Sequence, residues 1–323
     1  MQIKKVHKEV QTSAMHGNHK SVLAVDLGGT SIRVAIVGED GVIKEKIKEP
    51  TGSAPLNILK NLIENLHRPG IDAIGIAVAG VLNNAKTGVF KSPNIPSIEG
   101  IDLKEFIKKE NGISNVIIEN DANAAALGEA WLGAGREYGY FVLITLGTGI
   151  GGGVVCNNML APIAAEIGHM TIIANGDACL CGNVGCLELY ASGRAIVERA
   201  IQGIMAGTDT RLRSCCEGNA YKVSPEIVYE MALDGDAFSR ELLKDAGRYL
   251  GIGIANIINI FSPKAIILTG GLTGMWNIYV QEAIKEAHKR AFKELFDSAK
   301  IIPSQLGDDG GLIGAARLAL ING

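Results

Sequence analysis

The sequence predicts an α/β protein built of two lobes, and three observations support this fold class. Apolar runs typical of buried strands alternate with stretches whose apolar residues recur at helical spacing. A pattern of strand, glycine turn and strand occurs twice, in "VLAVDLGGTSIRVAI" and in "FVLITLGTGIGGGVV". The copies lie about 120 residues apart, which is close to the size of a domain. A chain of 323 residues can also bury two hydrophobic cores.

The N-terminal half begins with a predicted β-meander over residues 21–50, in which "DLGGT" and "GEDG" form the turns. A helix is expected over residues 55–67 and a buried strand over 71–80. The next helix should start at an Asp102 cap and end at Gly112. The strand "NVIIEND" then leads into an alanine-rich helix over residues 122–133.

The C-terminal half begins with the second hairpin, over residues 141–155. Overlaying the two hairpins places the turn 146–149 on the turn 27–30, which favours an internal duplication over chance similarity. The remaining elements are expected to be helices over 192–205, 225–235 and 237–261, a strand and third glycine turn over 265–274, one long helix over 276–296, a strand over 300–306 and a helix over 311–321.

The composition indicates a soluble globular protein, with 47% hydrophobic and 20% charged residues. A net charge of −3 without a basic tract argues against nucleic acid or an anionic membrane as a partner. Residues 1–20 are polar, lack the apolar core of a signal peptide and are expected to form a flexible arm. The six cysteines are not spaced like a disulfide framework, so we expect a cytoplasmic protein.

The glycine turns suggest phosphate binding. "GTGIGG" matches G-x-G-x-x-G, but a strand follows it instead of the helix of a dinucleotide-binding fold, and no P-loop motif occurs. Bare backbone N–H groups at such a turn can hold phosphate oxygens, and Thr30, Thr145 and Thr148 would add hydroxyl donors. Asp26, at a strand end, suits a magnesium ion and its waters. The alternative is that these are ordinary hairpin turns.

The motifs "DLGGTSIR", "ENDANAAALGEA", "TLGTGIGGG", "EIGH", "CLCGNVGCLE" and "TGG" occur in the order found in the ROK family of sugar kinases. The chain resembles this family from about Ser21 onward, in particular its glucokinase and N-acylmannosamine kinase branches. The resemblance implies an actin-like, ribonuclease-H-like two-lobed ATPase fold, with ATP and sugar in an interlobe cleft. We expect one lobe over 21–120, completed by a helix over 309–323, and the other over 121–308. The residues then implied around the nucleotide are Asp26, Gly28, Gly29, Thr30, Thr145, Gly147, Thr148, Gly149, Gly270 and Gly271.

Asp121 is the candidate general base, because a sugar kinase needs a carboxylate to accept the proton of the attacking hydroxyl. The competing interpretation is that Asp121 is an N-cap of the following helix. The resemblance assigns Asp121 as the base and places Asn120 at the sugar. Glu119 should point to the other face of the strand.

His169, Cys179, Cys181 and Cys186 have the spacing H-x9-C-x-C-x4-C, which predicts a tetrahedral zinc site. Four protein ligands leave no open position for a reacting water, so the zinc should be structural, and magnesium should serve the phosphates. Three unrelated buried thiols are the alternative interpretation.

The resemblance further places Glu166, His169 and Glu188 at the sugar hydroxyls, so the cysteine-rich loop 166–188 would be a metal-bound sugar-recognition loop. Asn94, in "SPNIP", is a possible further sugar contact, with an ordinary Pro-Asn turn as its alternative. One departure from the family is the glycine-poor segment 154–165, which leaves the identity of the sugar open.

These features predict an ATP-dependent kinase that phosphorylates a hexose hydroxyl, with glucose to glucose 6-phosphate as the first expectation. The alternatives are N-acetylmannosamine or N-acetylglucosamine as the sugar, and another phosphoryl donor. A non-catalytic sugar-binding regulator is a rival of a different class. A repressor is disfavoured, since only about 20 residues precede Ser21 and a helix-turn-helix domain needs more. The resemblance suggests a homodimer or homotetramer.

Overall fold

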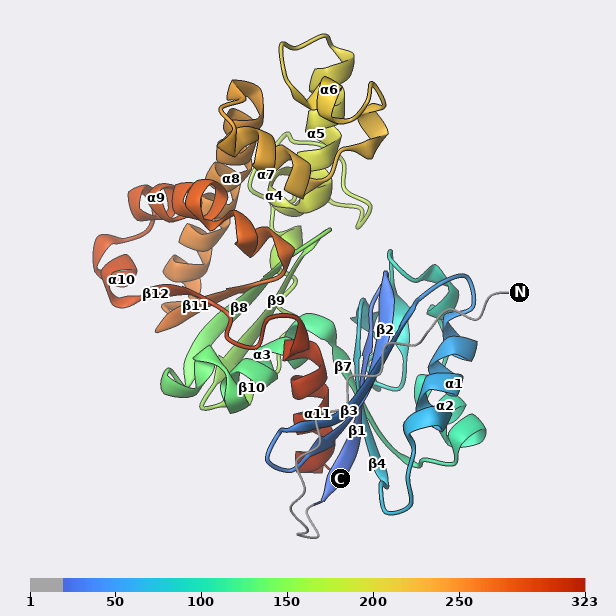
Figure 1. Cartoon of the computed structure of the whole chain (residues 1–323). Coiled ribbons are helices and arrows are strands. Elements are labelled where there is room, and N and C mark those ends of the chain that lie inside the picture. The colour runs from blue at the N-terminus through green and yellow to red at the C-terminus, as the bar shows by residue number, and fades with distance from the viewer. Residues whose placement is uncertain (1–19, 323) are drawn as a thin grey trace. The chain divides into compact units, whose positions relative to one another are not determined.

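The computed structural model describes residues 20–322, which form two compact units (Figure 1). Unit 1 contains the described residues up to Gly139, Val155–Ala161, and the described residues from Gln305 onward; unit 2 contains Tyr140–Val154 and Pro162–Ser304. The expected arm over residues 1–20 lies outside the described residues except for Lys20. No helix within residues 20–322 is both long and apolar enough to cross a bilayer.

Unit 1 has a five-stranded sheet in the order β3-β2-β1-β4-β7. β1 is antiparallel to β2 and parallel to β4, and β4 is parallel to β7. The elements of this unit, with the short 3-10 segments omitted, are β1 (Ser21–Leu27), β2 (Ser31–Gly38), β3 (Ile43–Pro50), α1 (Pro55–Leu66), β4 (Ala73–Val78), β5 (Val81–Leu82), β6 (Val89–Lys91), α2 (Leu103–Asn111), β7 (Asn115–Asn120), α3 (Asp121–Leu132), β10 (Met159–Leu160) and α11 (Gly310–Asn322). As predicted, Asp102 caps α2 by accepting from the Glu105 N–H at 2.9 Å, and Gly112 ends the helix at φ 73°.

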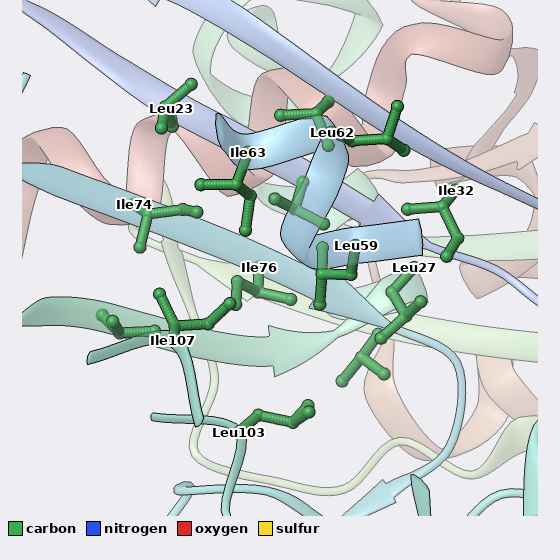
Figure 2. Packing of buried hydrophobic residues seen from close by; sticks show 14 of the residues in the cluster. Leu23, Leu27, Ile32, Leu59, Leu62, Ile63, Ile74, Ile76, Leu103 and Ile107 are labelled. Carbon is green, nitrogen blue, oxygen red and sulfur yellow. The ribbon is translucent and has the colours of Figure 1, made fainter. Parts of the chain in front are cut away.

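The side chains of β1 alternate between two cores. Leu23, Val25 and Leu27 belong to a core with α1 and α2, whose members include Leu59 and Ile107 (Figure 2). Val22 and Ala24 of the same strand belong to a second core, which contains residues of α3 and α11. Each buried leucine or isoleucine contributes about 1.5–3 kcal/mol. Both faces of the sheet are therefore covered at its central strands β1 and β4, and the ends of these strands can present functional groups.

Helices α3 and α11 pack very closely because glycine occupies the contact positions. A Cβ at Gly314 would lie 1.6 Å from the carbonyl oxygen of Ala124, and one at Gly128 would lie 2.6 Å from that of Gly310. Gly75 of β4 meets α11 in the same way, since its Cβ would lie 1.8 Å from the Ala315 oxygen. This packing places α3 in unit 1, so the expected lobe boundary after residue 120 is displaced to Gly139.

The second sheet, whose strands β8, β11 and β12 belong to unit 2, repeats this design in the order β10-β9-β8-β11-β12. β11 is parallel to both β8 and β12, just as β4 is parallel to both β1 and β7. The matching strand orders agree with the predicted duplication. The further elements are β8 (Tyr140–Leu146), β9 (Ile150–Cys156), α4 (Glu188–Ala191), α5 (Gly193–Met205), α6 (Leu212–Cys215), α7 (Pro225–Leu233), α8 (Ala237–Phe261), β11 (Ala265–Thr269), a π-helical turn (Trp276–Val280), α9 (Gln281–Arg290), α10 (Lys293–Ser298) and β12 (Lys300–Pro303).

One segment differs from the sequence-based expectation, and the structure of a second, for which none was stated, is now defined. The single helix expected over 276–296 is broken, because Ala291 is extended (φ −76°, ψ 155°) and the side-chain oxygen of Asn259 accepts from the Phe292 N–H at 2.9 Å. The glycine-poor segment after β9 forms a two-residue hairpin turn. Asn157 and Asn158 adopt its positive φ values of 55° and 61°, a conformation for which asparagine is the usual substitute for glycine.

Candidate active site

The first group of candidate residues lies at the carboxyl edge of the unit 1 sheet. Leu27 of β1, Val78 of β4 and Asn120 of β7 are aligned in register, and all three strands run in parallel. The residues that follow them therefore emerge at one edge, which is where α/β sheets bind ligands. The Ala79 N–H donates to the Leu27 oxygen at 3.1 Å and continues the alignment past the strand ends.

The glycine turn after β1 lies against the "SPNIP" loop. A Cβ at Gly29 would lie 2.7 Å from the Cβ of Asn94, so this turn needs a glycine to pass Asn94. Ser92 fixes the loop: it is fully buried, and its hydroxyl donates to the Ala79 oxygen at 2.7 Å. The Thr51 hydroxyl holds the other side of the turn through the Gly28 oxygen at 2.6 Å.

Asp26 is buried and forms an ion pair with Arg33 of β2. Burial raises the pKa of Asp26, and the Arg33 guanidinium opposes this shift. Arg33 also donates to the backbone carbonyl oxygen of Asp308 at 2.5 Å, and Asp308 lies just before α11. A Cβ at Gly311 would lie 3.2 Å from the Asp26 carboxylate, so the first turn of α11 faces this carboxylate. An aspartate held in this way can accept hydrogen bonds from the waters of a magnesium ion.

Asn120, and not Asp121, caps α3. The Asn120 side-chain oxygen accepts from the N–H groups of Ala122 and Asn123 at 2.9 and 3.2 Å, and its amide donates to the Gly80 oxygen at 3.1 Å. Asp121 is the first helical residue. The interpretation of Asp121 as the N-cap is therefore wrong, since the neighbouring asparagine has that role.

Glu119, the preceding residue of β7, is engaged inside unit 1. Its carboxylate is buried and pairs with Lys86 at 2.5 Å, and it accepts from the side-chain amide of Asn123 at 3.1 Å. Glu119 therefore has a structural role in unit 1.

The carboxyl edge of the unit 2 sheet carries the other glycine turns. Thr145 at the end of β8 pairs with Thr269 at the end of β11. The Thr145 hydroxyl accepts from the Gly151 N–H at 3.0 Å and so closes the hairpin. Gly270 has φ 96°, and a Cβ added to it would lie 2.4 Å from the backbone oxygen of Leu146. The glycine turn after β11 therefore packs directly on the turn after β8.

The orientation of the turn 147–149 is set by the start of α5. The N–H groups of Gly193 and Arg194 donate to the oxygens of Gly147 and Thr148 at 2.9 and 3.3 Å. In a planar trans peptide the carbonyl and the next N–H point in opposite directions. The N–H groups of Thr148 and Gly149 therefore point away from α5, as a backbone site for phosphate oxygens requires.

Glu188, at the start of α4, lies beside this turn. Its Oε2 accepts from the Ile150 N–H at 2.9 Å, and its Oε1 accepts from Arg194 at 3.0 Å. Glu166 is electrostatically close to Glu188 and His169. Burial, reinforced by the Glu188 charge, raises the pKa of Glu166, and His169 opposes the shift.

His169, Cys179, Cys181 and Cys186 converge, with one possible ligand atom from each lying within 4.8 Å of the others. Cys181 Sγ and Cys186 Sγ are 3.8 Å apart, and Cys179 Sγ lies 3.7 Å from His169 Nδ1. A tetrahedron with metal–sulfur bonds of about 2.3 Å has sulfur–sulfur edges of about 3.8 Å. The distances therefore fit a metal site, and all of these cysteines are free thiols.

Burial and the neighbouring thiols raise the pKa of Cys186 to about 12, so this thiol stays protonated unless a cation lies close to its sulfur. Asn183 supports the loop by donating to the His169 oxygen at 3.3 Å, to Thr171 at 2.9 Å and to Cys186 Sγ at 3.4 Å.

The predicted site residues thus form one group in each unit. Asp26, the turn 28–30, Asn94, Asn120 and Asp121 belong to unit 1, and the remaining candidates belong to unit 2. Sequence reasoning missed four residues that support them, namely Arg33, Ser92, Asn183 and Arg194. Asn183 could have been found from its position inside the cysteine loop, whereas the other three depend on tertiary contacts.

Two α/β units, each with a hairpin beside parallel strands and glycine turns at the carboxyl edge, define the actin-like fold class. Within this class, the ROK family model matches residues 22–321, so the chain belongs to the ROK family. The chain is 35% identical to the glucokinase of Streptomyces coelicolor, over 92% of this chain and 96% of that protein.

Two further relatives differ in function. The crystal structure of a ROK family glucokinase from Streptomyces griseus in complex with glucose and AMPPNP is 32% identical, with a TM-score of 0.82, and the match covers 93% of this chain and 99% of that one. The xylose repressor of Bacillus spizizenii is 31% identical, over 93% of this chain and 74% of the repressor. The family therefore includes both kinases and regulators.

Proposed function

We propose that the protein transfers the γ-phosphoryl group of ATP to a hexose hydroxyl, with glucose as the substrate and glucose 6-phosphate as the product. The observation that carries this proposal is the carboxyl edge of the unit 1 sheet, where the Asp26 turn lies at the end of β1, and Asn120 and Asp121 lie at the end of β7, two parallel strands on either side of β4. The similarity to a glucokinase that binds glucose and AMPPNP supports the same assignment.

In this proposal Asp121 accepts the proton of the attacking sugar hydroxyl. Asn120 and Asn94 of unit 1 contact the sugar. In unit 2 the carboxylates of Glu166 and Glu188 accept hydrogen bonds from sugar hydroxyls, and the Nε2–H of His169 donates one. Asp26 orients the waters of the magnesium ion that accompanies ATP. The glycine turns at 28–30, 147–149 and 270–271 approach the nucleotide, with the N–H groups of Thr148 and Gly149 available to phosphate oxygens.

The cysteine cluster has a structural role in this proposal, in which His169, Cys179, Cys181 and Cys186 hold one zinc ion. The zinc supplies a fixed point for the loop that carries Glu166 and Glu188. His169 faces the thiols through Nδ1. Binding of the metal through that nitrogen leaves Nε2 free to contact a sugar hydroxyl, so one histidine can serve both purposes.

The test is Asp121→Asn, which keeps the size of the side chain but removes the proton acceptor. We expect kcat to fall by roughly 10²-fold or more, with glucose binding largely retained. Asp102→Asn is the matched control, because Asp102 also lies at a helix start in unit 1 but caps α2. Near-normal turnover in Asp121→Asn would remove Asp121 from its role as base.

The xylose repressor relative supports a second candidate, a sugar-binding regulator without transferase activity. The two functions separate in one experiment on the wild-type protein. A regulator binds the sugar, as measured by calorimetry, and forms no ADP in its presence. A kinase forms ADP and sugar phosphate in equal amounts.

A further inference from the structure

Glu188 and Arg194 connect the cysteine cluster to the glycine turn 147–149, and the whole connection lies in unit 2. Cys186 is fully buried in the cluster. The next residue, Leu187, is also fully buried, and its N–H donates to the Met170 oxygen at 2.9 Å. Glu188 then begins α4, only two residues from a candidate metal ligand. The position of this carboxylate is therefore set by the metal loop.

The carboxylate of Glu188 reaches the turn directly. A Cβ at Gly149 would lie 2.3 Å from Glu188 Oε2, which also accepts from the Ile150 N–H at 2.9 Å. The other oxygen of this carboxylate accepts from Arg194 at 3.0 Å. Arg194 also contacts the turn directly, because its backbone N–H donates to the Thr148 oxygen at 3.3 Å.

We infer that Arg194 is a positioning residue that holds Glu188 against the glycine turn, so that nucleotide binding depends on the metal loop. This inference rests on the proposed function, in which the turn binds nucleotide phosphates. A glycine-rich turn is conformationally free, and outside contacts must fix its N–H groups in one direction. The Glu188 bonds to Ile150 and Arg194 are charge-assisted hydrogen bonds, which are stronger than neutral ones.

If the metal loop served the sugar alone, loss of the metal would leave nucleotide affinity unchanged in the absence of sugar. Loss of the metal loosens the loop that leads into Glu188, because all four candidate ligands precede this residue. Nucleotide affinity then falls even when no sugar is present, because the connection does not pass through the sugar.

The experiment is Arg194→Met in the full-length, metal-loaded protein. Binding of AMPPNP with magnesium is titrated calorimetrically without sugar, and KM and kcat are measured with glucose. We expect a Kd for AMPPNP and a KM for ATP that are roughly tenfold higher, with a smaller change in kcat. Arg194→Lys keeps the charge and should restore most of the affinity.

Arg248→Met is the matched control. Arg248 has the same side-chain exposure as Arg194, 36% against 35%, and pairs with Glu241 and Asp245 on α8. We expect this control to bind AMPPNP as the wild type does. A thermal melt of each variant shows that it is folded. Chelation of the metal should weaken AMPPNP binding by the wild type, and weaken it less in Arg194→Met, where the connection is already broken.

Unchanged AMPPNP affinity in a folded Arg194→Met protein overturns the inference. So does a metal-free protein that has lost sugar affinity alone. The proposed function fails separately: a wild type that binds AMPPNP but phosphorylates no sugar refutes the kinase assignment. A weakened Arg194→Met titration in that protein would still support the connection.

Discussion

Gly314→Ala in α11 should destabilise the protein, although alanine is the better helix former. The added Cβ would lie 1.6 Å from the oxygen and 2.3 Å from the carbonyl carbon of Ala124. Both atoms belong to the backbone of α3, so the two helices must separate by more than an ångström. Overpacking of this kind costs about 1–3 kcal/mol or more, against a gain of about 1 kcal/mol in helix propensity.

We therefore expect a net loss of about 1–2 kcal/mol and a fall in Tm of roughly 2–8 °C, measured by circular dichroism. Because Asp121 begins α3, the displaced helix should also lower kcat in the folded variant. Gly310→Ala is the control, since the atoms nearest to its added Cβ are at 3.7–3.9 Å, an ordinary contact distance. An unchanged or raised Tm in Gly314→Ala would show that the close packing of α3 and α11 is misjudged.

Two further variants test the nucleotide side and the metal. Asp26→Ala removes the partner of Arg33. Turnover should fall by roughly 10²-fold and require more magnesium, with sugar affinity in the absence of nucleotide nearly unchanged; a loss of sugar binding alone would contradict the nucleotide role. Cys181→Ser should lower the zinc content from about one per chain, reduce Tm and raise the sugar KM. Replacement of zinc by cobalt should leave the pH profile unchanged, because no metal-bound water reacts; a profile that moves with the metal would indicate a catalytic ion.

Local patterns in the sequence predict most of the fold. The two hairpins, the Asp102 cap and the Gly112 stop follow from periodicity and turn chemistry, which act over a few residues. Two predictions were wrong: the position of the lobe boundary, and an unbroken helix over 276–296, which in fact breaks after Arg290. The boundary depends on the glycine contacts between α3 and α11, which are about 190 residues apart in sequence. The break depends on Asn259, a residue of another helix.

The candidate site was predictable where the chemistry is encoded in spacing. The four metal-ligand candidates converge as the H-x9-C-x-C-x4-C pattern indicates. The roles of Asn120 and Asp121 at the start of α3 could not be separated from sequence, because both residues are good N-caps and only the hydrogen bonds distinguish them. Arg33 and Arg194 were missed because arginine on a strand or helix surface is usually solvated, and their carboxylate partners are known only from the fold.

The central claim, that the protein is an ATP-dependent hexose kinase, is tested most directly by one assay of the purified wild type. ADP formation is measured with ATP and magnesium over glucose, mannose, N-acetylglucosamine and N-acetylmannosamine. We expect turnover with kcat/KM at least about tenfold higher for glucose than for the other sugars. A preference for an N-acetylated sugar would correct the substrate but keep the kinase. Binding of sugar without ADP formation for every member of the panel would contradict the claim.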